Sequence, residues 1–270
     1  LFLLNTCAKK KDLESCREIH SLMLNQGLLA SDTFWSDHLI RSFANCGNFV
    51  QANEVFWNVP NPSIYTWNSV ISANSKLGNS KYALQLYFMM QNEGIKPDKY
   101  TLLATLRACI CVGSMKEGRL IHENVVKMGL ECDIVLGNTL INMYMKCGCL
   151  ESAERVFKYL PNRYIVSWTT LVTTYVYYGF NDEALNAFEH MTSDGISPNK
   201  VTFICILKIC GNIGDLVNGE KIHHEIVSKG LVEKDFVLAT ALVDMYAKCG
   251  AMEMAQQLHD EHCDQILDSW

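Results

Sequence analysis

The sequence has little proline, few charged residues and no long apolar run. Proline contributes 5 of the 270 residues, charged side chains 19 % and apolar side chains 49 %. This composition argues against an intrinsically disordered chain and favours one with a substantial core. No segment approaches the roughly 18 apolar residues of a membrane helix, so we expect no membrane span. The chain also lacks an initial methionine, and its apolar start is too short for a signal peptide. We therefore expect it to be a mature or truncated product, with any targeting segment outside this chain.

The sequence also lacks the motifs of common catalytic and metal sites. It contains no glycine-rich phosphate loop, no nucleophile elbow and no C-x-x-C pair. Two H-x-E stretches occur, His223 to Glu225 and His259 to Glu261, but H-x-E is only half of the zinc deaminase signature, whose other half is P-C-x-x-C. We predict that this chain is not an enzyme and carries no cofactor, no catalytic residue and no structural metal.

Positive charge is in deficit, because the net charge at pH 7 is −6. This value argues against a protein that holds nucleic acid mainly by bulk electrostatics, although it leaves room for basic positions along one groove.

Cysteine is plentiful, but half of the twelve cysteines repeat two positions. One register precedes a glycine and the other ends the stretches LLNTC, TLRAC and ILKIC, and together they hold Cys46, Cys147, Cys249, Cys7, Cys109 and Cys210. Such regularity favours small buried side chains between packed helices, in a reducing compartment, over disulfides or zinc ligands.

Internal repetition is the dominant signal. NTLINMYMKCG at 138–148 recurs as TALVDMYAKCG at 240–250, and GIKPDKYTLLATLRAC at 94–109 recurs as GISPNKVTFICILKIC at 195–210. The repeated unit divides into three segments, each with apolar residues at helical spacing and a glycine that ends a helix. A hairpin of two amphipathic helices cannot bury its apolar face alone, so we predict an all-α fold in which hairpins stack into an α-solenoid.

Two repeat families share the Ala and Phe four residues apart that recur here, as in Ala52 and Phe56. Tetratricopeptide repeats favour a Leu-Gly pair in the first helix, which is absent from the expected place. The stretches LVDMYAKCG, GEKIH, VSWTTLV, EALNAFEHM and GISPN, in repeats of 35, 35–36 and 31 residues, resemble instead the pentatricopeptide repeat family, specifically its plant PLS-type arrays. The resemblance covers the whole chain and implies a right-handed superhelix in which each repeat can contact one base of a single-stranded RNA.

The spacing places the repeats and the resemblance assigns their types. L-type repeats are expected at 1–32 (truncated at its start), 99–133 and 200–235; S-type repeats at 33–63, 134–164 and 236–266; P-type repeats at 64–98 and 165–199, with the start of another at 267–270. We expect the chain to be part of a longer array.

The resemblance also implies which residues read bases, namely the fifth residue of the first helix and the last residue of the repeat. These positions hold Asn68 with Asp98 and Thr169 with Asn199 in the P repeats, and Asn138 and Thr240 at the fifth position of two S repeats. By the family's preferences, the first pair favours U and the second favours A, while Asn138 indicates a pyrimidine and Thr240 a purine. Amide, hydroxyl and carboxylate groups can tell a donor from an acceptor on a base edge.

The remaining repeats are less informative. Tyr164 and Ile266, the last residues of those two S repeats, depart from the usual polar residue, and Asp37 with Ser63 fits no family preference. Aliphatic fifth residues in the L repeats (Leu1, Leu103 and Ile204) cannot hydrogen-bond a base, so these repeats are expected to act as spacers or to contact accessory proteins. The predicted register is 5′-U-N-Y-A-N-R-3′.

Two further registers are implied. The second residue of a repeat would lie against the bases; it is Phe34, Tyr65, Val135, Val166 or Val237. Lysines at the thirteenth position would approach the phosphates; they are Lys76, Lys146 and Lys248.

The function predicted from these features is sequence-specific binding of single-stranded RNA in a mitochondrion or chloroplast, with recognition of C-to-U editing sites as the implied task. A C-terminal extension or recruited partners would then deaminate the base; neither DNA nor membrane binding is expected. Two alternatives remain open at this stage: a role in RNA splicing, stability or translation, and a protein-binding scaffold in an organellar ribonucleoprotein or transcription assembly. Asn or Thr fills four of the five fifth positions in complete P and S repeats, which favours RNA.

Overall fold

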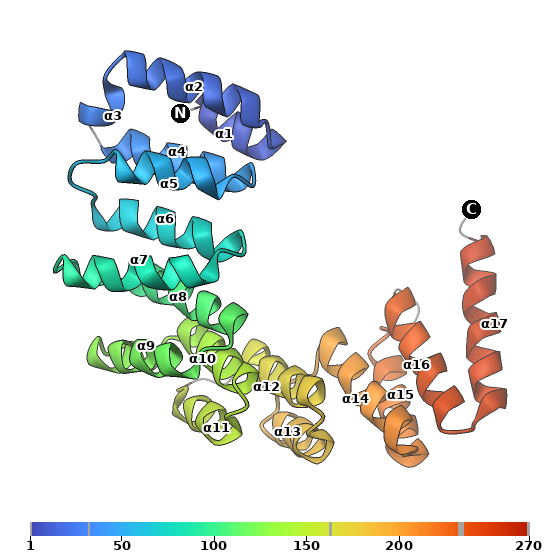
Figure 1. The fold of residues 1–270 in the computed structure, drawn as a ribbon. Coiled ribbons are helices and arrows are strands. Elements are labelled where there is room, and N and C mark those ends of the chain that lie inside the picture. The colour runs from blue at the N-terminus through green and yellow to red at the C-terminus, as the bar shows by residue number, and fades with distance from the viewer. Residues whose placement is uncertain (1, 32, 162–163, 232–234, 269–270) are drawn as a thin grey trace. The chain divides into compact units, whose positions relative to one another are not determined.

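The computed structural model describes residues 2–31, 33–161, 164–231 and 235–268, and in these ranges every regular element is an α-helix (Figure 1). The all-α prediction is therefore confirmed. The chain divides into two compact units, the first ending at Leu160 and the second beginning at Pro161. Among the described residues, no helix has the length and apolar character needed to cross a membrane.

The first unit consists of stacked helical hairpins. Its helices are α1 (Phe2–Lys10), α2 (Leu13–Asn25), α3 (Leu28–Ser31), α4 (Thr33–Asn45), α5 (Phe49–Trp57), α6 (Ile64–Lys76), α7 (Ser80–Asn92), α8 (Lys99–Val112), α9 (Met115–Lys127), α10 (Ile134–Lys146) and α11 (Leu150–Tyr159). Helices α1, α4, α6, α8 and α10 pack in succession and form one layer, which is the layer of first helices. The other long helices form the second layer: α5, α7 and α9, for example, each pack between the first helix of their own hairpin and that of the next.

The second unit repeats this arrangement. Its helices are α12 (Ile165–Tyr178), α13 (Asn181–Ser193), α14 (Lys200–Ile213), α15 (Leu216–Ser228), α16 (Phe236–Lys248) and α17 (Met252–Asp268). Helices α12, α14 and α16 are the first helices, and α13 and α15 each pack against two of them.

Helix capping explains where the first helices begin. From residue 33 on, each first helix starts at the first residue of a predicted repeat. The residue just before it is commonly Ser, Asp or Asn, whose side chain accepts a hydrogen bond from a backbone N–H of the new helix; this is so for Ser63, Asp98, Asp133, Asn199 and Asp235. These residue types are favoured N-caps because they satisfy a donor that the helix leaves unpaired. The last residue of one repeat is thus also the cap of the next.

Two features were not expected from the sequence. The short helix α3 lies between the first two hairpins. Helix α17 continues to Asp268 without a break at the boundary placed after residue 266. Residues 269–270 lie outside the described residues, as does Leu1.

The recurring stretches GRLIH and GEKIH reflect contacts between the second helix of one hairpin and the first helix of the next. A side chain at Gly118 or Gly219 would collide with Met143 or Met245, respectively, so glycine permits the close approach. Four residues later, Nδ1 of His122 lies 2.7 Å from the hydroxyl of Tyr144. Sequence identity between repeats therefore follows from packing.

The repeated cysteines belong to the core. Cys7, Cys109 and Cys210 are buried. Burial raises the pKa of Cys109 to about 12 and that of Cys210 to about 11, which keeps both thiols protonated. No group of three or more His, Cys, Asp or Glu side chains is arranged to hold a metal ion in the described part of the chain.

Candidate functional site

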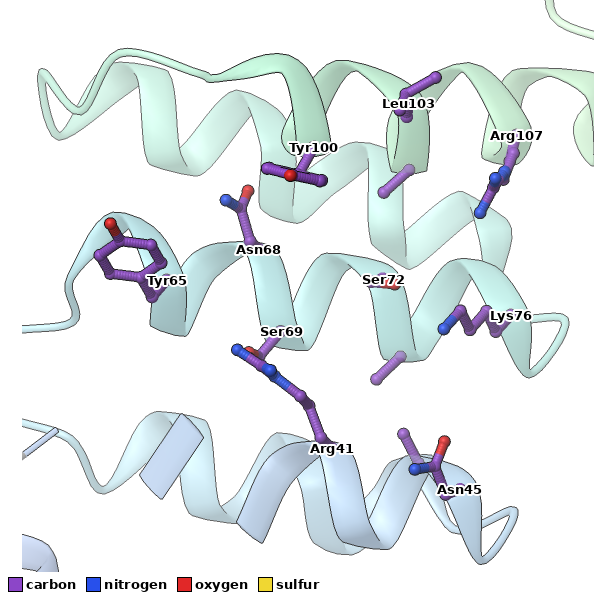
Figure 2. A pocket seen from close by; sticks show the side chains of 13 residues that line it. Arg41, Asn45, Tyr65, Asn68, Ser69, Ser72, Lys76, Tyr100, Leu103 and Arg107 are labelled. Carbon is purple, nitrogen blue, oxygen red and sulfur yellow. The ribbon is translucent and has the colours of Figure 1, made fainter. Parts of the chain in front are cut away.

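A cavity of ≈ 630 Å³ opens along the layer of first helices in the first unit, over α4, α6 and α8 (Figure 2). Arg41, Lys76 and Arg107 contribute positive charge to its lining, and no Asp or Glu is among the lining residues. Because an acid-free basic lining concentrates positive potential, this cavity can attract an anionic ligand although the whole chain is acidic.

Residues from all three predicted registers meet in this cavity. Asn68 from the base-reading set, Tyr65 from the base-contacting set and Lys76 from the phosphate-contacting set all line it. Tyr65 is 64 % exposed, so its ring can receive a planar ligand. Aromatic rings beside amide groups and cations suit a ligand that combines flat polar bases with phosphates.

Sequence reasoning missed three residues of the same lining. Tyr100, which is 71 % exposed, occupies the second position of a repeat typed as L, a type for which no base contact was expected. Arg41 and Arg107 occupy the ninth position, one turn after the fifth on the same face. The signal that could have identified them is the register that they share with Tyr65 and Asn68.

The Asn68 and Asp98 side chains are joined by a direct hydrogen bond. Nδ2 of Asn68 donates to Oδ2 of Asp98 at 2.9 Å, although 30 residues separate them. Oδ1 of Asp98 accepts from the backbone N–H of Thr101 at 2.8 Å, which fixes the carboxylate at the start of α8. Oδ1 of Asn68 accepts from Oγ1 of Thr101. Because an amide group has two donors and two acceptor sites, Asn68 keeps one N–H and one carbonyl lone pair for a ligand.

The second predicted pair is also in contact. Nδ2 of Asn199 donates to Oγ1 of Thr169 at 3.1 Å, and that hydroxyl donates to the carbonyl oxygen of Ile165 at 2.6 Å. Oδ1 of Asn199 accepts from the backbone N–H of Thr202 at 2.9 Å. This pair therefore leaves the second N–H of Asn199 available to a ligand. The Asn68 and Asp98 pair differs, because it leaves one N–H and one carbonyl lone pair of Asn68 available.

In the repeats at 99–133 and 200–235, both typed as L, the last residue makes a different interaction. Asp133 forms an ion pair with Lys99 at 2.5 Å, and Asp235 forms one with Lys200 at 2.6 Å. Burial alone would raise the pKa of Asp133, but Lys99 and the first backbone N–H groups of α10 hold it below its usual value. Leu103, the fifth residue of the repeat at 99–133, is aliphatic and cannot hydrogen-bond a base.

Among the described residues, the other predicted base-reading residues have no hydrogen bond of this kind to the last residue of their repeat. Oδ1 of Asn138 is buried and has no hydrogen-bond partner among the described residues. Thr240 is exposed, and its hydroxyl donates to the carbonyl oxygen of Phe236 at 2.8 Å. The side chain of Ile266 lies outside the described residues.

The predicted base-contacting residues share high exposure. They are 43 % to 64 % exposed despite being apolar or aromatic, and they are Phe34, Tyr65, Val135, Val166 and Val237. The predicted lysines differ from one another: Lys76 lines the cavity, Lys146 is an exposed residue at the end of α10, and Lys248 pairs with Asp244 at 2.7 Å.

Comparison with protein families identifies the repeats. A model described as "PPR repeat family" matches residues 62–111, and one described as "Pentatricopeptide repeat domain" matches 162–213. A third, "PPR repeat", matches 138–165 and 237–261. Together the matched segments cover more than half of the chain.

Curated relatives extend the match to nearly the full chain. Two chloroplastic pentatricopeptide repeat-containing proteins of Arabidopsis thaliana are 32 % and 33 % identical to it, over 268 and 270 residues. A mitochondrial pentatricopeptide repeat-containing protein of the same plant is 31 % identical over 268 residues. Each match covers 99 % of this chain, which in turn spans 43 %, 50 % and 42 % of these relatives.

Solved structures show the same fold. The crystal structure of the maize pentatricopeptide repeat protein PPR10 superposes with a TM-score of 0.74 at 20 % identity, covering 97 % of this chain and 38 % of that one. PPR10 in complex with an 18-nucleotide psaJ RNA element gives a TM-score of 0.73, also at 20 % identity, covering 93 % of this chain and 37 % of that one.

Proposed function

Because the chain belongs to the pentatricopeptide repeat family, we propose that it binds single-stranded RNA along its layer of first helices, in a mitochondrion or chloroplast. The observation that carries this proposal is the cavity over α4, α6 and α8. It combines two exposed aromatic rings, an amide with an unused donor and acceptor, and three cations without an acid. A protein ligand would need no such ordered set, whereas each group has a counterpart in a nucleotide.

We propose the following chemical roles for residues in that cavity and elsewhere along the first helices. Tyr65 and Tyr100 stack on bases, Asn68 with Asp98 reads one base edge, and the basic side chains contact phosphates. Thr169 with Asn199 reads a second base in the second unit. The proposed preference is U at the first pair and A at the second, within the register 5′-U-N-Y-A-N-R-3′, with Asn138 and Thr240 contributing a pyrimidine and a purine.

The finer task proposed is recognition of sites for C-to-U editing, by an array of the PLS subclass with its P, L and S repeats as assigned above. The chain spans half or less of the relatives described, so deamination would be carried out by other parts of the protein or by partners. Accessory proteins would dock at the L-type repeats. In the repeats at 99–133 and 200–235 the last residue is held in an ion pair and the fifth residue is aliphatic, so neither position is available to read a base. Loss of editing at transcripts that carry the register, in a plant without the gene, would support this task. Normal editing with altered splicing or stability would replace it.

The test of RNA binding uses the 270-residue chain and short single-stranded RNAs at physiological salt. One series carries U and A in the register and the other has them exchanged; fluorescence anisotropy gives the dissociation constants. We expect tighter binding of the first series. The variant Asn68→Thr with Asp98→Asn should prefer A in place of U. Asn92→Thr, an exposed change on α7 away from the cavity, is the matched control and should leave the preference intact.

Equal binding of both series by a folded, helical chain would contradict base reading. Absence of RNA binding, with no response to any of these variants, would favour the protein-scaffold alternative.

A further inference from the structure

A buried hydroxyl lies beneath each of the two base-reading pairs, and the family positions account for neither. Thr101, the third residue of α8, is 0 % exposed. Its Oγ1 donates to Oδ1 of Asn68, lies 3.0 Å from Oδ1 of Asp98 and accepts the backbone N–H of Asp98 at 3.1 Å. A single hydroxyl therefore touches both members of the pair.

The second unit contains the same arrangement. Thr202, the third residue of α14, is also 0 % exposed. Its Oγ1 lies 3.1 Å from Oγ1 of Thr169 and 3.0 Å from Oδ1 of Asn199. Because the two pairs differ in chemistry while the hydroxyl beneath them is the same, the hydroxyl serves the geometry of the pair and leaves the choice of base to its members.

After the L-type repeats at 99–133 and 200–235, the corresponding position carries no hydroxyl. There the third residue of the next helix is Leu136 or Leu238, both 0 % exposed. The preceding carboxylates, Asp133 and Asp235, form ion pairs with lysines instead. In these four repeats the hydroxyl is thus present where the fifth residue is polar, and an aliphatic group replaces it where the fifth residue is aliphatic.

We propose that Thr101 and Thr202 are positioning residues for base recognition, a role that rests on the RNA binding proposed above. The amide of Asn68 donates through Nδ2 to Asp98 and accepts through Oδ1 from Thr101. Rotating the amide by half a turn would bring Oδ1 against the Asp98 carboxylate and break both bonds. The remaining donor and acceptor are therefore held in one order along the cavity wall.

A fixed order matters because pyrimidines differ in theirs. The Watson–Crick edge of U presents a carbonyl, an N–H and a carbonyl, whereas that of C presents an amino group, a ring nitrogen and a carbonyl. An amide free to rotate can match either edge, while one held in place matches the edge whose donors and acceptors complement it. Thr101 acts on the base through Asn68 and Asp98 and needs no contact of its own.

A purely structural role makes a different prediction. Thr101 also completes the capping box of α8, so its loss could weaken the helix start. That effect would lower the stability of the chain and its affinity for every RNA alike, and it would leave the ratio of affinities for different bases unchanged.

The experiment compares Thr101→Val with Thr202→Val in the 270-residue chain. Affinities are measured for RNAs that differ only at the base opposite Asn68 or only at the base opposite Thr169. We expect Thr101→Val to reduce the preference at the first base by about threefold to tenfold and to leave the second unchanged, with the reverse for Thr202→Val. Thr101→Ser should restore the preference. Thr105→Val removes a buried hydroxyl one turn further along α8 and should alter neither base.

Equal loss of affinity for all bases, or unchanged preferences in both variants, would overturn the positioning role while RNA binding stood. A readout in the free chain separates the two proposals. Nuclear magnetic resonance of the Asn68 side-chain amide should show faster hydrogen exchange in Thr101→Val than in the parent chain, and unchanged exchange would overturn the role. If the parent chain bound no RNA, the proposed function would fail and this amide measurement would still decide on Thr101.

Discussion

The two units share one scaffold and differ in the face that their first helices carry. At the second position of neighbouring helices, the first unit has Tyr65 and Tyr100, whereas the second has Val166 and Val201. All four side chains are exposed, so packing does not dictate the difference. The repeats thus keep their core residues and vary their exposed ones, which allows two units of the same fold to bind one ligand with unequal strength.

The first helices of the two units also differ in positive charge, which is greater in the first unit. The first unit places Arg41, Lys76 and Arg107 in its cavity with no acid in the lining. In the second unit, Lys208 is the ninth residue of α14, and Asp244 takes the ninth position of α16, where it neutralises Lys248. We therefore expect the first unit to supply most of the affinity and the second mainly to add selectivity.

The largest effect should come from the rings. Tyr65→Ala with Tyr100→Ala should weaken RNA binding about thirtyfold or more, because stacking on an aromatic ring contributes about 1–3 kcal/mol per base. Val166→Ala with Val201→Ala is the matched change in the second unit and should cost less than about fivefold. Dissociation constants measured by fluorescence anisotropy check both. Similar losses for the two double variants would remove the proposed difference between the units.

Removal of charge should give the next largest effect. Replacing Arg41, Lys76 and Arg107 by Gln should lower the slope of log affinity against log salt by about 2, since each phosphate contact on single-stranded nucleic acid contributes about 0.7. Lys248→Gln should change the slope little, because Asp244 already pairs that lysine. Titrations at several salt concentrations test this. A Lys248→Gln effect as large as that of the triple variant would contradict it.

A smaller effect is expected from exchanging the reading pairs. Thr169→Asn with Asn199→Asp gives the second unit the pair of the first, and Thr202 already supplies the hydroxyl beneath it. The variant should bind RNA with U at that position about tenfold more tightly than RNA with A, whereas the parent chain should prefer A. Affinities for RNAs that differ only at that base test this. A retained preference for A would mean that the two positions do not carry the selectivity.

The smallest effect is expected from breaking the ion pairs of Asp133 and Asp235 with their lysines. Lys99→Gln should lower the free energy of unfolding at pH 7 by less than about 1 kcal/mol, because the ion pair with Asp133 is partly exposed. The pKa of Asp133 is depressed in the folded chain, so its contribution is present above the unfolded value and disappears as pH falls through the folded value. The difference between variant and parent should therefore shrink below about pH 4 in urea unfolding.

Lys200→Gln is the matched change in the second unit and should behave in the same direction. A difference between variant and parent that grew on acidification would contradict the sign of the shift.

The fold was predictable because repeats repeat their packing. The recurring GEKIH marks a glycine at a close helix approach, and Asp98 or Asn199 before an apolar stretch marks a helix start. The family register also named Asn68 and Asp98 together, although their direct hydrogen bond was not predicted. The glycine and the caps are each a sequence signal from one residue type with one dominant local role.

Other parts of the site could not be found in this way. Thr101 reads as an ordinary core threonine, because sequence does not show that its hydroxyl meets a side chain 33 residues earlier. The ion pair of Lys99 with Asp133 joins the two ends of a repeat that was expected to act as a spacer or to contact accessory proteins. Tyr100 was excluded by the type assigned to its repeat, and only its place in the cavity shows what it can do.

The cap residue starts a helix and is also proposed to read a base, and this double role affects how such a chain can change its target over generations. Asp and Asn start a helix about equally well, so a single substitution between them at position 98 or 199 should barely disturb folding. An aliphatic residue at the same place would forfeit the cap and carry a selective penalty unrelated to RNA. New specificities are therefore reached most easily through the few residue types that also cap a helix. The fold itself thus limits which residue types a lineage can use at this position.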